Sequence, residues 1–201
     1  MSEILFVNAC VRGEESRTLK LAHDFFEEYA KAHPGDTVTE RNLMEQRIQP
    51  LYPETKAEKD ALWAAGRLDA PMFEPARQFA SADKVVIAAP LWDMAYPAIL
   101  RIYTEAISVI NILFRYTEEG ECVGMAKAKK LLFITTRGSD FSLPEMGGME
   151  SGAYHLKALC TMYGIPHFEV LVAEGLDDVR NDAAAILSAA SGRARDLAQA
   201  W

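Results

Sequence analysis

The chain has 201 residues, of which 50% are hydrophobic and 25% are charged, and its 21 basic and 29 acidic side chains give a formal net charge of −8. A globular chain of this length buries about 70% of the surface that its unfolded form exposes. Scattered basic residues and a net negative charge argue against a nucleic-acid partner and against an anionic membrane surface, because both are bound through clustered Lys and Arg. We therefore expect a single domain over residues 1–201, with no nucleic-acid and no membrane partner.

Targeting signals and cysteine usage indicate the cellular compartment of the protein. No apolar run approaches the roughly 20 residues of a membrane span, and Met1-Ser2-Glu3 lacks the basic start of a secretory signal. The cysteines Cys10, Cys122 and Cys160 are odd in number and far apart, without a Cys-x-x-Cys pair. These features predict a cytoplasmic protein, because a reducing compartment keeps thiols free. The histidines have no metal-ligand spacing, so we expect no metal site.

The first half of the chain alternates short strands with helices. Residues 4–7 form a β-branched and aromatic run, and a polar turn separates them from a helical pattern that begins at Ser16 and ends before Pro34. A second strand is expected at residues 37–43. Prolines then divide the following region into short helices, expected at about residues 55–68 and 73–81.

The second half continues the alternation. An unbroken apolar run at residues 84–90 predicts a strand that is covered on both faces of a sheet, followed by a helix at 97–113. The polar segment 114–120 is too long for a tight connection, and we expect it to project from the body of the protein. The remaining elements are a strand, a helix, a strand and a helix, expected at residues 130–136, 151–163, 168–173 and 182–199.

This order of elements predicts the fold class. Strands that alternate with helices favour an α/β protein with a parallel, doubly wound sheet, because right-handed crossovers allow little else. Five such strands fit the flavodoxin-like order 2-1-3-4-5 with helices on both faces. In these sheets ligands bind beyond the carboxyl ends of the strands, where the strand order reverses. The loops after the first, third and fourth strands therefore form the candidate site.

The loop after the first strand, residues 8–19, lacks both the G-x-G-x-x-G fingerprint and the G-K-[ST] motif. It instead places the hydroxyls of Ser16 and Thr18 at a helix start, where free backbone N–H groups favour an anion such as phosphate. On the local sequence alone, simple capping of the helix by Ser16 is the better explanation of this residue. Cys10 is better explained as a small buried side chain than as a nucleophile.

The loop after the third strand reads Pro90-Leu91-Trp92-Asp93-Met94. Large apolar side chains at the edge of a site are costly to expose unless they cover something flat, which favours a planar cofactor ring. Packing of Trp92 on its own helix or at a subunit contact is the alternative.

The loop after the fourth strand contains Gly138, which lets the backbone approach a ligand closely. Its neighbouring amides are possible donors to a bound ring, although many turns contain such residues. Past the fifth strand lies an acidic group that we expect to cap the last helix, namely Glu174, Asp177 and Asp178.

In their order along the chain these segments resemble the FMN-dependent NAD(P)H oxidoreductases of flavodoxin-like fold, which include azoreductases and quinone reductases. Ser16-Arg17-Thr18 is similar to the family's S-x-S phosphate loop, and Pro90-Leu91-Trp92-Asp93-Met94 to its P-[ML]-[YW]-N-F flavin loop. Residues 114–120 resemble its F-[RK]-Y-T-E-x-G segment, residues 135–139 its T-S-R-G-G turn, and residues 159–175 its last helix and strand. The resemblance covers nearly the whole chain.

The resemblance implies a set of FMN-binding residues. The phosphate would lie near Cys10 and against Ser16, Arg17 and Thr18. One side of the isoalloxazine would meet Leu91, Trp92, Asp93 and Met94, and its other edge Thr136, Arg137, Gly138 and Ser139. No catalytic acid or base is implied, because the cofactor carries the chemistry.

Three departures from the family pattern concern the flavin. Asp93 stands where the family usually has Asn, Ser139 replaces a Gly, and Ala9 and Cys10 replace hydroxyl-bearing residues. A carboxylate in place of an amide removes a hydrogen-bond donor and adds negative charge, which disfavours an anionic reduced flavin unless Asp93 is protonated or paired. The flavin potential and the choice of acceptor are therefore open.

For activity, the resemblance implies that flavin N5 takes a hydride from NADH or NADPH. A small aromatic acceptor, such as a quinone, an azo compound or a nitro compound, then replaces the nicotinamide and is reduced, in ping-pong order. A homodimer is implied, with residues 48–68 and 114–120 as candidate walls and Phe114 facing the flavin. The alternatives are a flavodoxin-like FMN electron carrier and a non-catalytic flavin-binding regulatory module.

Overall fold

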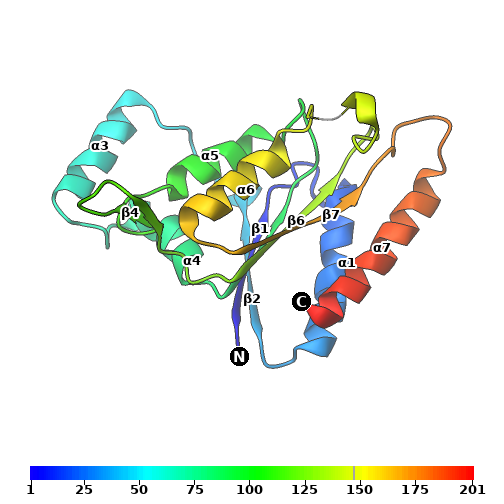
Figure 1. Cartoon of the computed structure of the whole chain (residues 1–201), viewed down its shortest axis with the longest axis horizontal. Helices are drawn as coiled ribbons and strands as arrows, with labels where there is room; N and C mark the ends of the chain where they lie inside the picture. The colour runs from blue at the N-terminus through cyan, green and yellow to red at the C-terminus, as the bar shows by residue number, and fades with distance from the viewer. Residues whose placement is uncertain (147) are drawn as a thin grey trace.

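A five-stranded parallel sheet in the order β2-β1-β3-β6-β7 forms the centre of the computed structural model, which describes residues 1–146 and 148–201 (Figure 1). Its strands are β1 (Glu3–Asn8), β2 (Thr37–Asn42), β3 (Lys84–Ala88), β6 (Lys130–Thr136) and β7 (His167–Ala173). All four neighbouring pairs are parallel. Counted within the sheet, this is the order 2-1-3-4-5, so the predicted doubly wound topology is confirmed.

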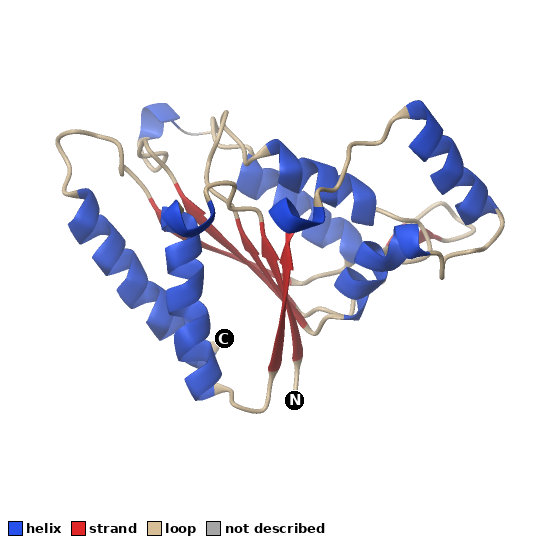
Figure 2. Cartoon of the chain, turned by 180° about the vertical axis from the view of Figure 1, so that it is seen from behind, coloured by secondary structure: helices blue, strands red, loops and turns tan. Residues whose placement is uncertain are grey.

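Helices cover both faces of this sheet (Figure 2). One face carries α1 (Arg17–Ala32) and α7 (Ala183–Ala200), which lie side by side, and the other carries α4 (Glu74–Ser81), α5 (Ala98–Ile107) and α6 (Gly152–Tyr163). The short helix α2 (Leu43–Gln46) follows β2, and α3 (Pro53–Ala64) stands away from the sheet, at the left of Figure 1. None of the helices described is long and apolar enough to cross a membrane.

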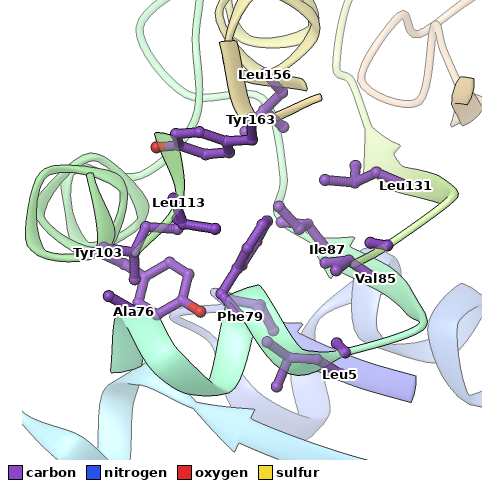
Figure 3. Packing of buried hydrophobic residues seen from close by; sticks show 14 of the residues in the cluster. Leu5, Ala76, Phe79, Val85, Ile87, Tyr103, Leu113, Leu131, Leu156 and Tyr163 are labelled. Atoms are coloured by element: carbon purple, nitrogen blue, oxygen red, sulfur yellow. The ribbon is translucent and has the colours of Figure 1, made fainter. Parts of the chain in front are cut away.

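Alternation along the strands divides the core into two clusters, because successive side chains of a strand point to opposite faces. Ile4, Phe6, Val86 and Leu132 face the layer of α1 and α7. Figure 3 shows the other cluster, in which side chains of α4, α5 and α6 meet the sheet. Its labelled members include Leu5, Val85, Ile87 and Leu131 from the strands and Phe79, Tyr103 and Tyr163 from the helices.

The last helix begins later than the acidic group that was expected to cap it. The side chain of Asp182 accepts hydrogen bonds from the backbone N–H groups of Ala184 and Ala185, both at 3.0 Å. The predicted capping role of the earlier carboxylates is therefore wrong. These carboxylates bind arginines instead, in the pairs Glu174 with Arg137, Asp177 with Arg17, and Asp178 with Arg180.

The region after α5 also differs from the prediction. The helix ends at Ile107 instead of residue 113, and Asn111 turns the chain with a φ of 68°. The next residues form an antiparallel hairpin of β4 (Phe114–Tyr116) and β5 (Cys122–Gly124). The hairpin packs on the end of α6 so closely that a Cβ on Gly124 would lie 2.1 Å from the backbone nitrogen of Gly164. The prediction that residues 114–120 project from the body is wrong for Phe114, which is buried, whereas Arg115 and Tyr116 are exposed.

Candidate functional site

The loops that follow the strands of the sheet meet around a cavity of about 230 Å³. Six of its lining residues were predicted from the sequence, namely Ser16, Arg17, Leu91, Trp92, Thr136 and Gly138. Four more were not predicted, namely Arg12, Glu15, Pro90 and Asp177. Arg12 and Glu15 belong to the polar turn before α1, which was the available signal for them. The predicted loops therefore come together at the carboxyl edge of the sheet.

The first turn of α1 provides the anion-binding side of this cavity. Ser16 Oγ accepts a hydrogen bond from the Leu19 N–H at 3.3 Å, so the alternative of helix capping is confirmed for this residue. The earlier N–H groups of the helix have no partner within it, and the positive end of the helix dipole points the same way. Backbone groups of α1 are therefore available to an anion at this position.

Arg17 and Thr18 are held by other parts of the chain. The Arg17 guanidinium donates to the Leu176 carbonyl at 3.2 Å and to Asp177 Oδ1 at 2.8 Å. The Thr18 side chain is fully buried, and its hydroxyl forms a hydrogen bond with the Thr136 hydroxyl at 2.6 Å. Thr18 thus joins the start of α1 to the end of β6. The predicted contact of both side chains with a phosphate stays a prediction.

Cys10 is buried beneath the same loop. Its thiol lies 3.6 Å from the Ala88 carbonyl, and its backbone N–H donates to Asn8 Oδ1 at 3.0 Å. Burial raises the pKa of the Cys10 thiol to about 11. The thiol is therefore protonated at neutral pH, in agreement with a packing role and not a nucleophilic one.

The loop after β3 has an unusual backbone. Asp93 and Met94 adopt φ values of 49° and 62°, and the Ala95 N–H donates to the Trp92 carbonyl at 2.9 Å, which closes a tight turn. Two successive non-glycine residues in the left-handed region are strained, and such strain persists only where the surroundings hold it. Ser151 supplies part of this support, because its N–H and its hydroxyl donate to the Met94 carbonyl at 2.8 and 2.9 Å.

This turn presents apolar side chains to the solvent beside the cavity. Trp92 is 40% exposed and Met94 is 45% exposed. The preceding Leu91 is fixed to the sheet, because its N–H donates to the Thr136 carbonyl at 3.0 Å. A rigid loop with exposed apolar side chains forms a platform that suits a flat ring.

Arg137 braces the turn after β6. It is only 9% exposed, and its guanidinium lies 2.6 Å from Glu174 and 3.4 Å from Glu150. Its Nε is buried and has no hydrogen-bond partner among the described residues. The arrangement leaves one donor of a buried arginine unsatisfied in the turn after β6, and a bound acceptor atom would stabilise it.

The next two residues are Gly138, which lines the cavity, and Ser139, which does not. A Cβ on Gly138 would lie 2.4 Å from Asp177 Oδ2, so a side chain at this position would have to displace the Asp177 carboxylate. The Gly138 carbonyl accepts the Asp177 N–H at 3.0 Å, and the Ser139 carbonyl accepts the Gly175 N–H at 3.2 Å. The carbonyls of this turn are thus bound to the loop after β7.

Phe114 does not line the cavity at the three loops. It is 7% exposed in the hairpin, and its ring stacks on that of Tyr163 with centroids 6.4 Å apart. Within its own chain Phe114 therefore contributes no wall to this cavity, and the prediction that it forms a flavin-facing wall across a homodimer stays a prediction. Its hairpin neighbour Tyr116 is exposed instead.

The residues that are present fit the FMN implied by the resemblance. Free N–H groups at the start of α1 suit its phosphate, the exposed Trp92 and Met94 suit one face of its ring, and Arg137 Nε is an unsatisfied donor near its other edge. These three features lie on separate loops that converge on the cavity. The predicted flavin contacts all stay predictions, and six of the predicted residues do not line this cavity, namely Cys10, Thr18, Asp93, Met94, Arg137 and Ser139.

Comparison with known proteins agrees with this site. A family model described as a flavodoxin-like fold matches residues 2–197. FMN-dependent NADH:quinone oxidoreductase 2 from Clostridium acetobutylicum is 36% identical over 200 residues, which cover 99% of each chain. The chain belongs to the flavodoxin-like family of quinone reductases and azoreductases.

Two further members of this family extend the comparison. FMN-dependent NADH:quinone oxidoreductase from Coprothermobacter proteolyticus is 34% identical over 203 residues, which cover 99% of each chain. The crystal structure of an azoreductase from Bacillus anthracis strain Sterne superposes with a TM-score of 0.89 at 27% identity and covers 100% of both chains. The family resemblance found in the sequence is therefore confirmed.

Proposed function

We propose that this chain is an FMN-dependent NADH:quinone oxidoreductase that reduces quinones and azo compounds in ping-pong order. The observation that carries the proposal is the convergence of the three loops on one cavity, in a chain whose relatives are named FMN-dependent NADH:quinone oxidoreductases. The cofactor is FMN and the reductant is NADH. NADPH is the second candidate reductant.

Each loop has a role in binding the cofactor. The N–H groups at the start of α1 hold the phosphate, with Ser16 and Arg17 beside it. Leu91, Trp92 and the strained turn after them support one face of the ring. Arg137 and Gly138 border the other edge, where Glu174 and Glu150 keep the arginine in place.

FMN held by these loops would supply the chemistry of two-electron transfer from NADH to the acceptor. The chain itself orients the two reactants. The exposed Trp92 and Met94 offer an apolar surface that admits a nicotinamide or an aromatic acceptor but does not select one acceptor. A ping-pong order follows if both molecules use this one surface in turn.

A homodimer is part of the proposal. The exposed apolar residues of the turn after β3 would be covered by a second copy, and the exposed Tyr116 in the hairpin and the helix α3 are the candidate walls that a second copy would contribute. The cytoplasmic location inferred from the cysteine pattern stays a prediction.

Visible absorption tests the proposal. Purified protein is incubated with FMN, desalted and then mixed with NADH or NADPH under anaerobic conditions. The proposed enzyme retains yellow flavin, loses the colour with NADH and regains it when a quinone is added. Flavin that stays yellow with both nucleotides would indicate an electron carrier, and failure to retain FMN would contradict the assignment of the cavity.

A further inference from the structure

Glu150 is a buried carboxylate just before α6 that the sequence did not single out. It is 9% exposed, and it does not line the cavity at the three loops. A charged side chain is seldom buried to this extent unless other groups hold it. The partners of Glu150 therefore indicate its role.

The first partner is the start of α6. The two carboxylate oxygens of Glu150 accept the Ala153 N–H at 2.9 and 3.3 Å, so Glu150 caps the helix. Ser151 occupies the N-cap position, yet among the described residues its side chain accepts no capping hydrogen bond. Its hydroxyl instead donates to the Met94 carbonyl at 2.9 Å, in the strained turn after β3. Because Glu150 does what a serine at the N-cap commonly does, the Ser151 hydroxyl is free to hold this turn.

The second partner is Arg137, in the turn after β6. Its guanidinium lies 3.4 Å from Glu150 Oε2 and 2.6 Å from Glu174. The next residue, Gly138, lines the cavity. One carboxylate therefore connects the support of the turn after β3 with the turn after β6.

Close packing surrounds this connection. A Cβ on Gly152, the first residue of α6, would lie 2.8 Å from Glu150 Oε1, 3.0 Å from Tyr96 Cδ1 and 3.2 Å from the Ala95 carbonyl carbon. The start of α6 thus touches both the carboxylate and the chain that follows the strained turn. A shift of this helix start would reach the turn directly, because packed interiors transmit strain.

Loss of the carboxylate would leave the Ala153 N–H without its acceptor. Ser151 stands at the N-cap position, from which its hydroxyl can replace that acceptor. Rotation of the hydroxyl toward α6 would release the Met94 carbonyl. Arg137 would keep Glu174 as an ion-pair partner and lose the contact on the side of α6. The turns after β3 and β6 would then both relax.

We propose that Glu150 is a positioning residue for the isoalloxazine ring of FMN. It acts through Ser151 on the turn that supports one face of the ring, and through Arg137 on the opposite edge. This role requires no contact between Glu150 and the cofactor. It rests on the proposed function, because it takes the cavity at the three loops as the FMN site.

Riboflavin, which lacks the phosphate of FMN, separates the ring side of the site from the phosphate side. Quenching of flavin fluorescence on titration with flavin-free protein gives the dissociation constant of each ligand. Glu150→Ala should weaken FMN and riboflavin by the same factor, at least about tenfold, because both ligands carry the ring. Glu150→Gln keeps an acceptor for the Ala153 N–H and should lose less, about threefold for each ligand. Arg17→Leu, on the phosphate side, should weaken FMN and leave riboflavin within about twofold.

A second readout separates positioning from stability. At saturating FMN the absorption bands of the bound flavin should shift in Glu150→Ala and should match the parent in Arg17→Leu. A purely structural role would lower the amount of folded protein without moving these bands. Glu145→Gln, at an exposed carboxylate in the segment before α6, is the matched control and should leave both affinities and the bands unchanged.

Glu150→Ala with the affinities and absorption bands of the parent would overturn the proposal. A loss confined to FMN would also overturn it, because Glu150 would then act on the phosphate. If Glu150→Ala does not fold, Ser151→Ala removes the hydroxyl that holds the Met94 carbonyl and should weaken both flavins about threefold; unchanged affinity for both would count equally against the proposal. A parent protein that binds no FMN would contradict the proposed function itself, whereas a parent that binds FMN no better than Glu150→Ala rejects only the role of Glu150.

Discussion

Helices α1 and α7 close one face of the sheet, whereas the other face is open at the edge where α3 stands away from the sheet (Figure 1). A cavity of about 530 Å³ lies between α3 and the helices α5 and α6. Helix α1 buries Thr18, Leu19, Leu21, Ala22, Phe25 and Tyr29, while α3 buries no residue. Apolar burial is the dominant stabilising term in folding. We infer that α1 on the closed face is part of the stabilising core, whereas α3 on the open face can shift without loss of the fold.

The largest effect is expected from Phe25→Ala on the closed face. Phe25 is fully buried, and its ring lies within 5.7 Å, centroid to centroid, of the rings of Phe26, Tyr29 and Trp201. Truncation of such a side chain leaves a cavity and costs about 3–5 kcal/mol. Urea unfolding measures this loss in the free energy of unfolding. Lys20→Ala, on the exposed side of α1, is the control, and a loss below about 1 kcal/mol in Phe25→Ala would refute the view that α1 is part of the stabilising core.

A smaller effect is expected from Asp93→Asn in the turn after β3. Asp93 adopts a left-handed conformation that Asn tolerates well, so Asp93→Asn should preserve the fold. Removal of its negative charge should favour the reduced flavin and raise the midpoint potential by up to about 30 mV, equivalent to about 1.4 kcal/mol for a two-electron couple. Spectroelectrochemistry of the FMN-loaded protein measures this. Asp140→Asn, in the next loop, is the control, and an unchanged or lower potential would place Asp93 away from the ring.

His155 should make the open face sensitive to pH. Burial, together with the nearby Arg101 charge, lowers the pKa of His155 below its usual 6.5. The unfolded chain therefore takes up this proton first as the pH falls. The stability that neutral His155 contributes is present above about pH 6.5 and is lost as the pH falls toward the folded pKa.

His155→Gln removes this titration. We expect the parent protein to lose more stability than His155→Gln between about pH 7.5 and pH 5.5. Urea midpoints at the two pH values provide the comparison, and His23→Gln on the exposed surface of α1 serves as the control. Parallel losses in the parent and His155→Gln would show that the hydrogen bonds of His155 with Tyr96 and Arg101 do not depend on the charge of this ring.

The sequence predicted the central sheet because strand and helix periodicities are local properties of the chain. It did not predict the hairpin of β4 and β5, because the burial of Phe114 depends on Tyr163, which lies far along the chain in α6. The early end of α5 has a similar cause, since it depends on a turn at Asn111 that no glycine or proline marks.

The candidate site shows the same limit. Loop residues such as Ser16 and Trp92 were predicted because residue type and position at a strand end indicate their role. Asp177 was missed, because its contact with Arg17 joins residues 160 positions apart. The strain at Asp93 was also missed, since its φ depends on how Ser151 holds the end of the turn.

The smallest effect is expected from Trp63→Ala, the counterpart of Phe25→Ala on the open face. Trp63 is 41% exposed, and its one polar contact is the hydrogen bond to the Ile110 carbonyl. Its loss should therefore lower the free energy of unfolding by about 1 kcal/mol or less. Urea unfolding under the conditions used for Phe25→Ala gives the ratio of the two effects directly. Equal losses in the two variants would show that α3 is a cooperative part of the core, and the contrast between a closed and an open face would then fail.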